Sequence, residues 1–352
     1  MMNLQHILKT LVFSSVLLAA TACESIFEGA QDCTTKIKFE FRKNRQALQA
    51  VNGKSTDAFE ASVSTVHLFI YNAENGKLVF QQFANTDDLS TETDLGIGSG
   101  STKSYIAVDL PAGTYSIIAW CGLDENDENN AFALAQTSRA ATTYDHCAVK
   151  LAEPATPLHD EKYQALYHGA ATQIELHSNG ETVPIQLTKN TNDIAVMVQH
   201  LTTTLVTDDY EVVYTDANGT MDFADNSVDN SQVLEYFPHT KYVITTDQTE
   251  FNGSTAETGA VIAHISTARL LENNAETARL EVRNRKGETI FSIPLIQYLL
   301  RMQTFTNDGQ YYLDCEDTYN CSFYLTGDYE RWQPAQIIIN NWVIVPDQAG
   351  NI

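Results

Sequence analysis

Short segments in which charged and apolar residues alternate constrain the fold of this chain most strongly. In Lys36-Ile37-Lys38-Phe39-Glu40-Phe41 the apolar side chains all lie on one face of an extended strand. Residues 63–71 resume the pattern, and Asn75-Gly76 then supplies a hairpin turn into a second strand at residues 78–80. The alternation predicts antiparallel sheets that bury one face.

The same pattern continues to the C-terminus. Further strands are predicted at residues 105–110, 115–120, 183–187, 194–201, 210–214, 278–284, 289–293 and 337–345. A long polar loop is expected at residues 85–104, and a linker at residues 188–193. Helical patterns are confined to residues 160–167 and 294–302. The predicted fold class is therefore all-β.

The length of 352 residues is about twice that of a typical domain. Because strands and turns recur at regular spacing in both halves, we expect two tandem antiparallel β-sandwich domains. Their predicted bounds are residues 23–185 and 186–352, after an N-terminal leader at residues 1–22.

Residues 1–22 have the pattern of an export signal. Lys9 precedes an apolar run at residues 11–20, which is too short to span a bilayer as a helix. Ala20-Thr21-Ala22-Cys23 follows and resembles the lipobox of bacterial lipoproteins, although Ala20 stands where Leu is usual. We expect Cys23 to carry the lipid, with about 0.8 kcal/mol of membrane affinity from each buried methylene. An ordinary signal peptide cut after Ala22 is the alternative.

The charge balance excludes one class of partner. The chain carries 21 Lys and Arg against 45 Asp and Glu, a formal net charge of −24. Nucleic-acid binding depends on basic patches that attract the phosphate backbone, so it is not expected here. Electrostatic docking on anionic lipid is not expected for the same reason.

Five further cysteines follow Cys23. In an exported protein they can be oxidised, and Cys121 with Cys147 and Cys315 with Cys321 are candidate disulfides that leave Cys33 unpaired. The alternative for each is a buried free thiol. Their spacing is unlike that of a zinc site, so no metal is expected.

No residue is nominated for catalysis. Gly96-Ile97-Gly98-Ser99-Gly100 lacks the spacing and the Lys of a phosphate-binding loop. Four histidines (His146, His159, His168 and His177) are scattered without a metal-like spacing. The acidic loop at residues 124–130 lacks the Gly and final Glu of an EF-hand, so a solvated loop is favoured over a Ca²⁺ site. We expect a non-enzyme without a cofactor or small-molecule substrate.

Several segments in a fixed order resemble one family. They are the lipobox Cys23 with Cys33 ten residues later, Val66-His67-Leu68-Phe69-Ile70-Tyr71-Asn72 with Asn75-Gly76, Leu110-Pro111-Ala112-Gly113-Thr114-Tyr115 leading to Ala119-Trp120, Leu166-Tyr167-His168-Gly169, Leu187-Thr188-Lys189-Asn190-Thr191-Asn192, and Ile339-Asn340-Asn341-Trp342-Val343-Ile344. Together they resemble the FimB-like fimbrial anchor lipoproteins of Bacteroidetes-type (type V) pili. The resemblance runs over nearly the whole chain after the leader.

The resemblance implies two transthyretin-like β-sandwich domains and an outer-membrane lipoprotein at the base of a fimbrium. Stalk subunits of such pili lose their first strand by proteolysis after an Arg, and a neighbour's strand then completes the open sheet. An anchor keeps its first strand, here residues 37–41, and its lipid, here on Cys23. It binds the major stalk subunit and limits the length of the polymer. The apolar stretch at residues 337–345 is a candidate for that pairing, or else an internal core strand.

Two alternatives remain open at this point. Arg42-Lys43-Asn44-Arg45 directly follows the first strand, where a trypsin-like protease would cut a stalk or tip subunit, or it is a plain solvated loop. Trp120, Trp332 and Trp342 are possible stacking platforms of a surface glycan-binding lipoprotein, or else core residues.

Overall fold

The computed structural model describes most of the chain from residue 34 onward. The described residues are 34–41, 48–51, 54–57, 59–93, 102–123, 131–134, 148–151, 162–177, 180–200, 205–224, 232–251, 254–301, 313–326, 333–339 and 342–344. The chain is mostly β-strand, which confirms the predicted class. Among these residues, no helix is long and apolar enough to cross a membrane.

One eight-stranded sheet is built from the first half of the chain. Its strands lie in the order β5-β4-β8-β11-β12-β1-β7-β6. Their bounds are Leu78–Asn85, Thr65–Asn72, Gly113–Cys121, Tyr167–Leu176, Thr182–Lys189, Thr35–Phe41, Thr102–Val108 and Ser90–Thr93. A small hairpin, β2 (Leu48–Val51) with β3 (Lys54–Asp57), and two short helices, α2 (Phe59–Ser62) and η1 (Thr86–Asp88), complete this part. We call it the N-terminal lobe.

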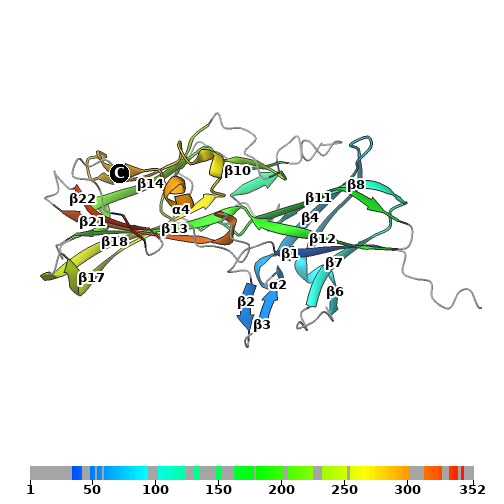
Figure 1. The fold of residues 1–352 in the computed structure, drawn as a ribbon, viewed down its shortest axis with the longest axis horizontal. Coiled ribbons are helices and arrows are strands. Elements are labelled where there is room, and N and C mark those ends of the chain that lie inside the picture. The colour runs from blue at the N-terminus through cyan, green and yellow to red at the C-terminus, as the bar shows by residue number, and fades with distance from the viewer. Residues whose placement is uncertain are drawn as a thin grey trace, which may run out of the picture.

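Two sheets are built from the second half, which we call the C-terminal lobe (Figure 1). The six-stranded sheet has the order β17-β18-β13-β21-β22-β23, with bounds Thr240–Phe251, Ser254–Ala268, Thr191–His200, Thr318–Thr326, Gln333–Ile339 and Trp342–Ile344. The four-stranded sheet has the order β16-β14-β19-β20, with bounds Leu234–Tyr236, Tyr210–Asp216, Arg279–Asn284 and Thr289–Ile293. The helices are α4 (Leu295–Arg301), η3 (Thr207–Asp209), η4 (Glu272–Asn274) and η5 (Leu313–Cys315).

A three-stranded sheet joins the two lobes. Strand β10 (Ala148–Leu151) pairs with β9 (Phe132–Leu134) on one side and with β15 (Thr220–Asp222) of the C-terminal lobe on the other. One face of β4 and β8 packs in the core of the N-terminal lobe. Side chains on the opposite face, such as Phe69 and Trp120, belong to the same hydrophobic cluster as residues of this three-stranded sheet and the core of the C-terminal lobe. Both faces of β4 and β8 are therefore buried, which explains why β4 reads as a nearly continuous apolar run.

The structure corrects five expectations from the sequence. The sheets are not wholly antiparallel, because β1 pairs in parallel with β12 and β13 pairs in parallel with β21. In each pair the two strands are far apart in sequence, so no tight turn joins them and a parallel arrangement is possible. Strand β6 lies inside the expected loop 85–104. Residues 162–166 of the expected helix 160–167 have no regular secondary structure, and β11 begins at Tyr167. The linker expected at residues 188–193 is instead strand on both sides of Asn190. The single strand expected at residues 337–345 is a hairpin of β22 and β23.

The other predicted helix and the Asn75-Gly76 hairpin are confirmed. Helix α4 occupies the expected segment 294–302, and Gly76, with φ of 67°, closes the β4–β5 hairpin in the left-handed region that favours glycine. Residue 185, where we predicted the domain boundary, lies within β12, and the chain passes to the second group of sheets at Asn190. The division into two domains stays a prediction.

Candidate functional site: the first strand and the lobe junction

Strand β1 lies inside the eight-stranded sheet rather than at its edge. It pairs with β12 from Lys36 to Phe41 and with β7 from Thr35 to Lys38 (Figure 1). Every second side chain points into the core, and Ile37 and Phe39 are fully buried. Phe39 also stacks on Phe59 of α2, with ring centroids 5.5 Å apart. Loss of β1 would therefore open a groove between β12 and β7.

The solvent side of β1 carries a charge cluster that reaches β6. Nζ of Lys36 lies 2.9 Å from Oε2 of Glu92, and Lys38 forms a second ion pair with Glu92. The hydrogen bond from Lys38, followed by that from Lys36, holds the pKa of Glu92 below its usual value. This contact ties the short edge strand β6 to the first strand.

The segment Lys189-Asn190-Thr191-Asn192, which carries much of the family resemblance, forms the lobe junction. The side-chain nitrogen of Asn190 lies 2.8 Å from Nδ1 of His168, and the Asn190 backbone N–H donates to the carbonyl oxygen of Leu166 at 2.7 Å. The His168 ring lies 5.2 Å from that of Trp120. Asn190 is 1% exposed, so its amide is a buried, paired group at the point where β12 ends and β13 begins.

Asn192 connects three segments of the C-terminal lobe. Its Nδ2 donates to the carbonyl oxygen of Glu316 at 3.2 Å, and its Oδ1 accepts from the backbone N–H of Leu270 at 3.1 Å. Both partners are main-chain groups outside the helices and strands. An Asn side chain carries N–H donors and an acceptor oxygen in the same plane, which fits this position.

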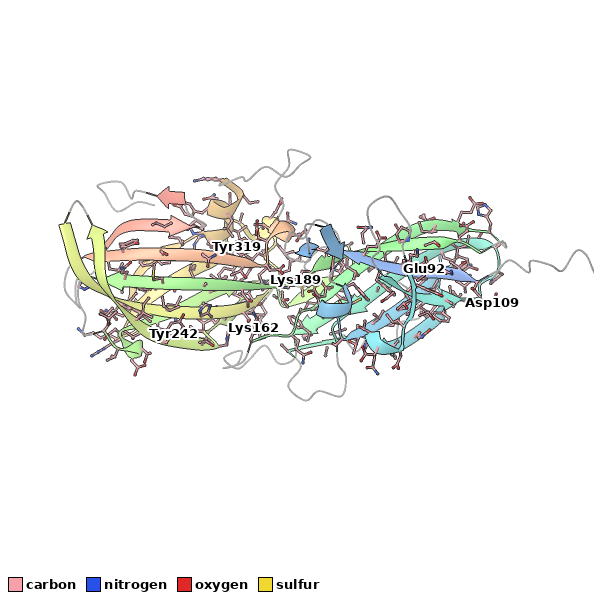
Figure 2. The ribbon with its side chains drawn as sticks, turned by 90° about the horizontal axis from the view of Figure 1, so that it is seen from below. Glu92, Asp109, Lys162, Lys189, Tyr242 and Tyr319 are labelled. Carbon is pink, nitrogen blue, oxygen red and sulfur yellow. The ribbon has the colours of Figure 1, made fainter. Side chains whose placement is uncertain are left out.

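Two ion pairs cross between residues of the two lobes. Lys189, at the end of β12, lies 3.0 Å from Asp317, directly before β21, and both side chains are largely buried. Lys162, before β11, lies 2.6 Å from Asp193 of β13, and Lys162 is mostly exposed. Figure 2 places both lysines between the lobes. The junction is therefore held by side chains as well as by the β10–β15 pairing.

A buried carboxylate lies in the C-terminal lobe. Asp216 accepts from the Tyr214 hydroxyl at 2.8 Å, from Nδ2 of Asn274 at 2.6 Å and from the Ala217 backbone N–H at 2.7 Å. Burial raises the pKa of Asp216 to about 6 in spite of these donors. The network fixes the turn after β14 against η4.

The described thiols are buried, and burial keeps them protonated and unreactive. Cys121 of β8 and Cys321 of β21 are free in the structure. Burial raises the pKa of the Cys121 thiol well above its usual value and that of Cys321 to about 12. Their expected partners, Cys147 and the side chain of Cys315, lie outside the described residues, so both disulfides stay predictions.

Several other predicted sites also lie outside the described residues. They are Cys23, Cys33, the loop with Arg42 and Arg45, Gly96–Gly100, the acidic loop 124–130, His146, His159 and Trp332. Within the described part, no three His, Cys, Asp or Glu side chains gather as a metal site. Trp120 is fully buried and packs in the core, so it is unsuited to stack on a sugar.

Sequence reasoning found the junction segment but missed its partners. The available signal is an Asn-rich stretch between two β patterns, which by its composition predicts a linker. Lys162, Leu270, Glu316 and Asp317 come from other segments, with Glu316 124 residues away from Asn192, and nothing in their local sequence marks the contact.

Comparison with known proteins shows a family match over most of the chain. Residues 30–347 match a family model described as Fimbrillin-A associated anchor proteins Mfa1 and Mfa2. No curated protein sequence matches the chain.

Three solved structures show the fold. A candidate adhesin from Bacteroides thetaiotaomicron is 23% identical with a TM-score of 0.68, over 88% of this chain and 97% of that one. A candidate polysaccharide-binding protein from the same organism is 23% identical with a TM-score of 0.64, over 91% and 100%. The fimbrial anchor protein Mfa2 from Porphyromonas gingivalis is 16% identical with a TM-score of 0.60, over 89% and 98%.

Proposed function

Because the chain belongs to the family of fimbrillin-A associated anchor proteins Mfa1 and Mfa2, we propose that it anchors a fimbrium to the outer membrane and limits its length. In this proposal the chain is a non-catalytic subunit at the fimbrium base. It consists of two tandem transthyretin-like β-sandwich domains, it is held in the membrane by lipid on Cys23, and its polymer partner is the major stalk subunit.

The position of β1 is the observation that carries this proposal. A subunit that accepts a neighbour's strand must expose an open groove in its sheet, whereas here β1 fills the place between β12 and β7 with Ile37 and Phe39 in the core. A chain that keeps β1 accepts no strand at this position. It therefore ends the polymer at the membrane, and this accounts for the limited length.

We also propose that the stalk is joined through the C-terminal edge. Strand β22 is paired on both sides, and its Ile337 and Ile339 are core residues, so the interior-strand interpretation fits this part of the stretch 337–345. Strand β23 ends the described six-stranded sheet. A stalk strand added there would extend that sheet by main-chain hydrogen bonds.

Gene deletion with complementation tests the anchoring role. Cells without the gene should carry longer fimbriae that shed into the medium, and the wild-type gene should restore short, attached ones. A Cys23→Ala gene should leave the fimbriae shed, whereas the matched Cys33→Ala gene should restore attachment. Fimbriae of unchanged length and attachment in the deleted strain would rule the role out.

A further inference from the structure

The outer edge of β5 is the longest uncharged sheet edge among the described strands. Among the described residues, no strand pairs with β5 on the side away from β4. All eight of its residues, LVFQQFAN, are uncharged, and none is proline. Natural edge strands are usually protected by charge, proline or shortness. Most other edges follow this rule, because β6 carries the paired Glu92, β17 contains Lys241, and β9, β15, β16 and β23 have three residues each. Edge strand β20 (TIFSI) is also uncharged, but it is shorter than β5, with five residues against eight.

The main chain of β5 offers a regular set of outward hydrogen-bonding groups. Beyond the strand, the backbone N–H of Thr86 donates to the carbonyl oxygen of Ser64 at 2.9 Å, in register with the Asn85–Thr65 pair. Backbone groups of an antiparallel strand alternate in direction, so those of Gln81, Phe83 and Asn85 face away from β4. The irregularity in the β4–β5 pairing falls at Val79, outside this run.

Phe83, an apolar side chain held in place by aromatic contacts, lies at the centre of this run. Phe83 is 50% exposed, and its ring rests on His67 and Phe69 of β4, at centroid distances of 4.3 Å and 6.1 Å. Its orientation is thus fixed before any partner arrives, which lowers the entropy cost of binding. Val79, 47% exposed, lies on the same strand.

We propose that this edge pairs with the same edge of a second copy of the chain, antiparallel and with Phe83 opposite Phe83. In this register each Gln81 lies opposite an Asn85, and the two phenyl rings form a cross-strand aromatic pair. The pairing joins two eight-stranded sheets into one continuous sheet across a two-fold axis. It involves neither the leader nor β23, so it is independent of the anchoring role.

The charges around β5 favour a second copy in the antiparallel sense. Lys77 directly precedes the strand, and Asp87 and Asp88 follow it. Antiparallel pairing brings Lys77 of each copy towards the two aspartates of the other, whereas parallel pairing would place like charges together. The uncharged strand between them also avoids the repulsion that a net charge of −24 creates elsewhere on the surface.

Sedimentation velocity of the purified full chain over a range of concentrations tests the proposal. The wild type should show a monomer–dimer equilibrium, and Phe83→Lys should raise the dimer dissociation constant by roughly tenfold or more. The matched control Val206→Lys, at a residue 48% exposed in the other lobe, should leave it unchanged. A wild type that stays monomeric, or a dimer that Phe83→Lys leaves intact, would overturn the proposal.

Cysteine cross-linking tests the register. Two residues opposite each other in a hydrogen-bonded antiparallel pair have Cα atoms about 5.5 Å apart, within disulfide range. Phe83→Cys should therefore form a covalent dimer on mild oxidation, above the background of the wild-type cysteines. Gln81→Cys should do so only when mixed with Asn85→Cys. Efficient dimers of Gln81→Cys alone would contradict this register.

Discussion

Position 169 has room only for glycine, because β11 and β12 approach closely there. A Cβ at this position in β11 would lie 2.6 Å from Cγ2 of Ile185 and 2.7 Å from the carbonyl oxygen of Gln186, both on β12. We expect Gly169→Ala to lower the free energy of unfolding by about 3 kcal/mol, because neighbouring backbone must move. Chemical denaturation measures this change.

A second glycine provides the control for that substitution. A Cβ at Gly113 would meet Tyr115 at 3.4 Å, which is ordinary contact with a side chain. Gly113→Ala should therefore alter stability by much less. Equal effects of the two substitutions would show that β11 and β12 do not approach as closely as described.

Asp216 is expected to make stability depend on pH. Its pKa is raised from 3.8 to about 6 on folding, so its contribution is fully present below pH 3.8 and is lost as the pH rises through about 6. Asp216→Asn removes the charge, and its one carbonyl oxygen can still accept from Asn274 and Ala217 while its NH2 group can donate to the Tyr214 hydroxyl oxygen. Between pH 4 and pH 8, the stability of this variant relative to the wild type should rise by about 3 kcal/mol.

Urea unfolding at several pH values measures that difference. Asp109→Asn, which removes a carboxylate from an exposed position, serves as the matched control. A constant difference between Asp216→Asn and the wild type across the range would contradict the raised pKa of Asp216.

At the level of single elements, the sequence predicted strands well where one face is buried. Alternation identified β1, and Asn75-Gly76 identified the β4–β5 hairpin. It failed at β6, because a four-residue polar strand has no apolar period to detect. It merged β22 with β23 because both are apolar and the sequence between them, Asn340-Asn341, contains no glycine or proline.

The contribution of β1 to stability is testable with a matched pair of phenylalanines. Phe39 is fully buried and stacked on Phe59, so Phe39→Ala should lower the free energy of unfolding by about 3–5 kcal/mol. Phe83 is half exposed, and Phe83→Ala, measured at low protein concentration, should have a clearly smaller effect. Similar losses for both would argue against β1 as a core strand.

At the level of the whole molecule, contacts between distant segments decide how the lobes are joined. The family resemblance pointed to Lys189-Asn190-Thr191-Asn192, but the pairing partners depend on three-dimensional proximity that local pattern does not encode. The same holds for β15, which pairs with β10 across about 70 residues of sequence. Local alternation predicts which segments are strands, and long-range packing determines which of them meet.

A double-mutant cycle tests the ion pair at the junction. Lys189 and Asp317 are only 13% and 16% exposed, so we expect a coupling energy of about 1–2 kcal/mol from Lys189→Met and Asp317→Asn. The Lys162–Asp193 pair has a lysine that is 64% exposed and should give about 0.5 kcal/mol or less. Coupling that is no larger for the buried pair would contradict a stabilised junction.

The central claim is that the chain on the cell surface keeps both its lipid and its first strand. Intact-mass spectrometry of the protein extracted from outer membranes tests this most directly. We expect an acylated chain that begins at Cys23 and includes β1 (Thr35–Phe41). A chain that begins after Arg42 or Arg45, without lipid and without β1, would instead identify a processed subunit and contradict the anchoring role.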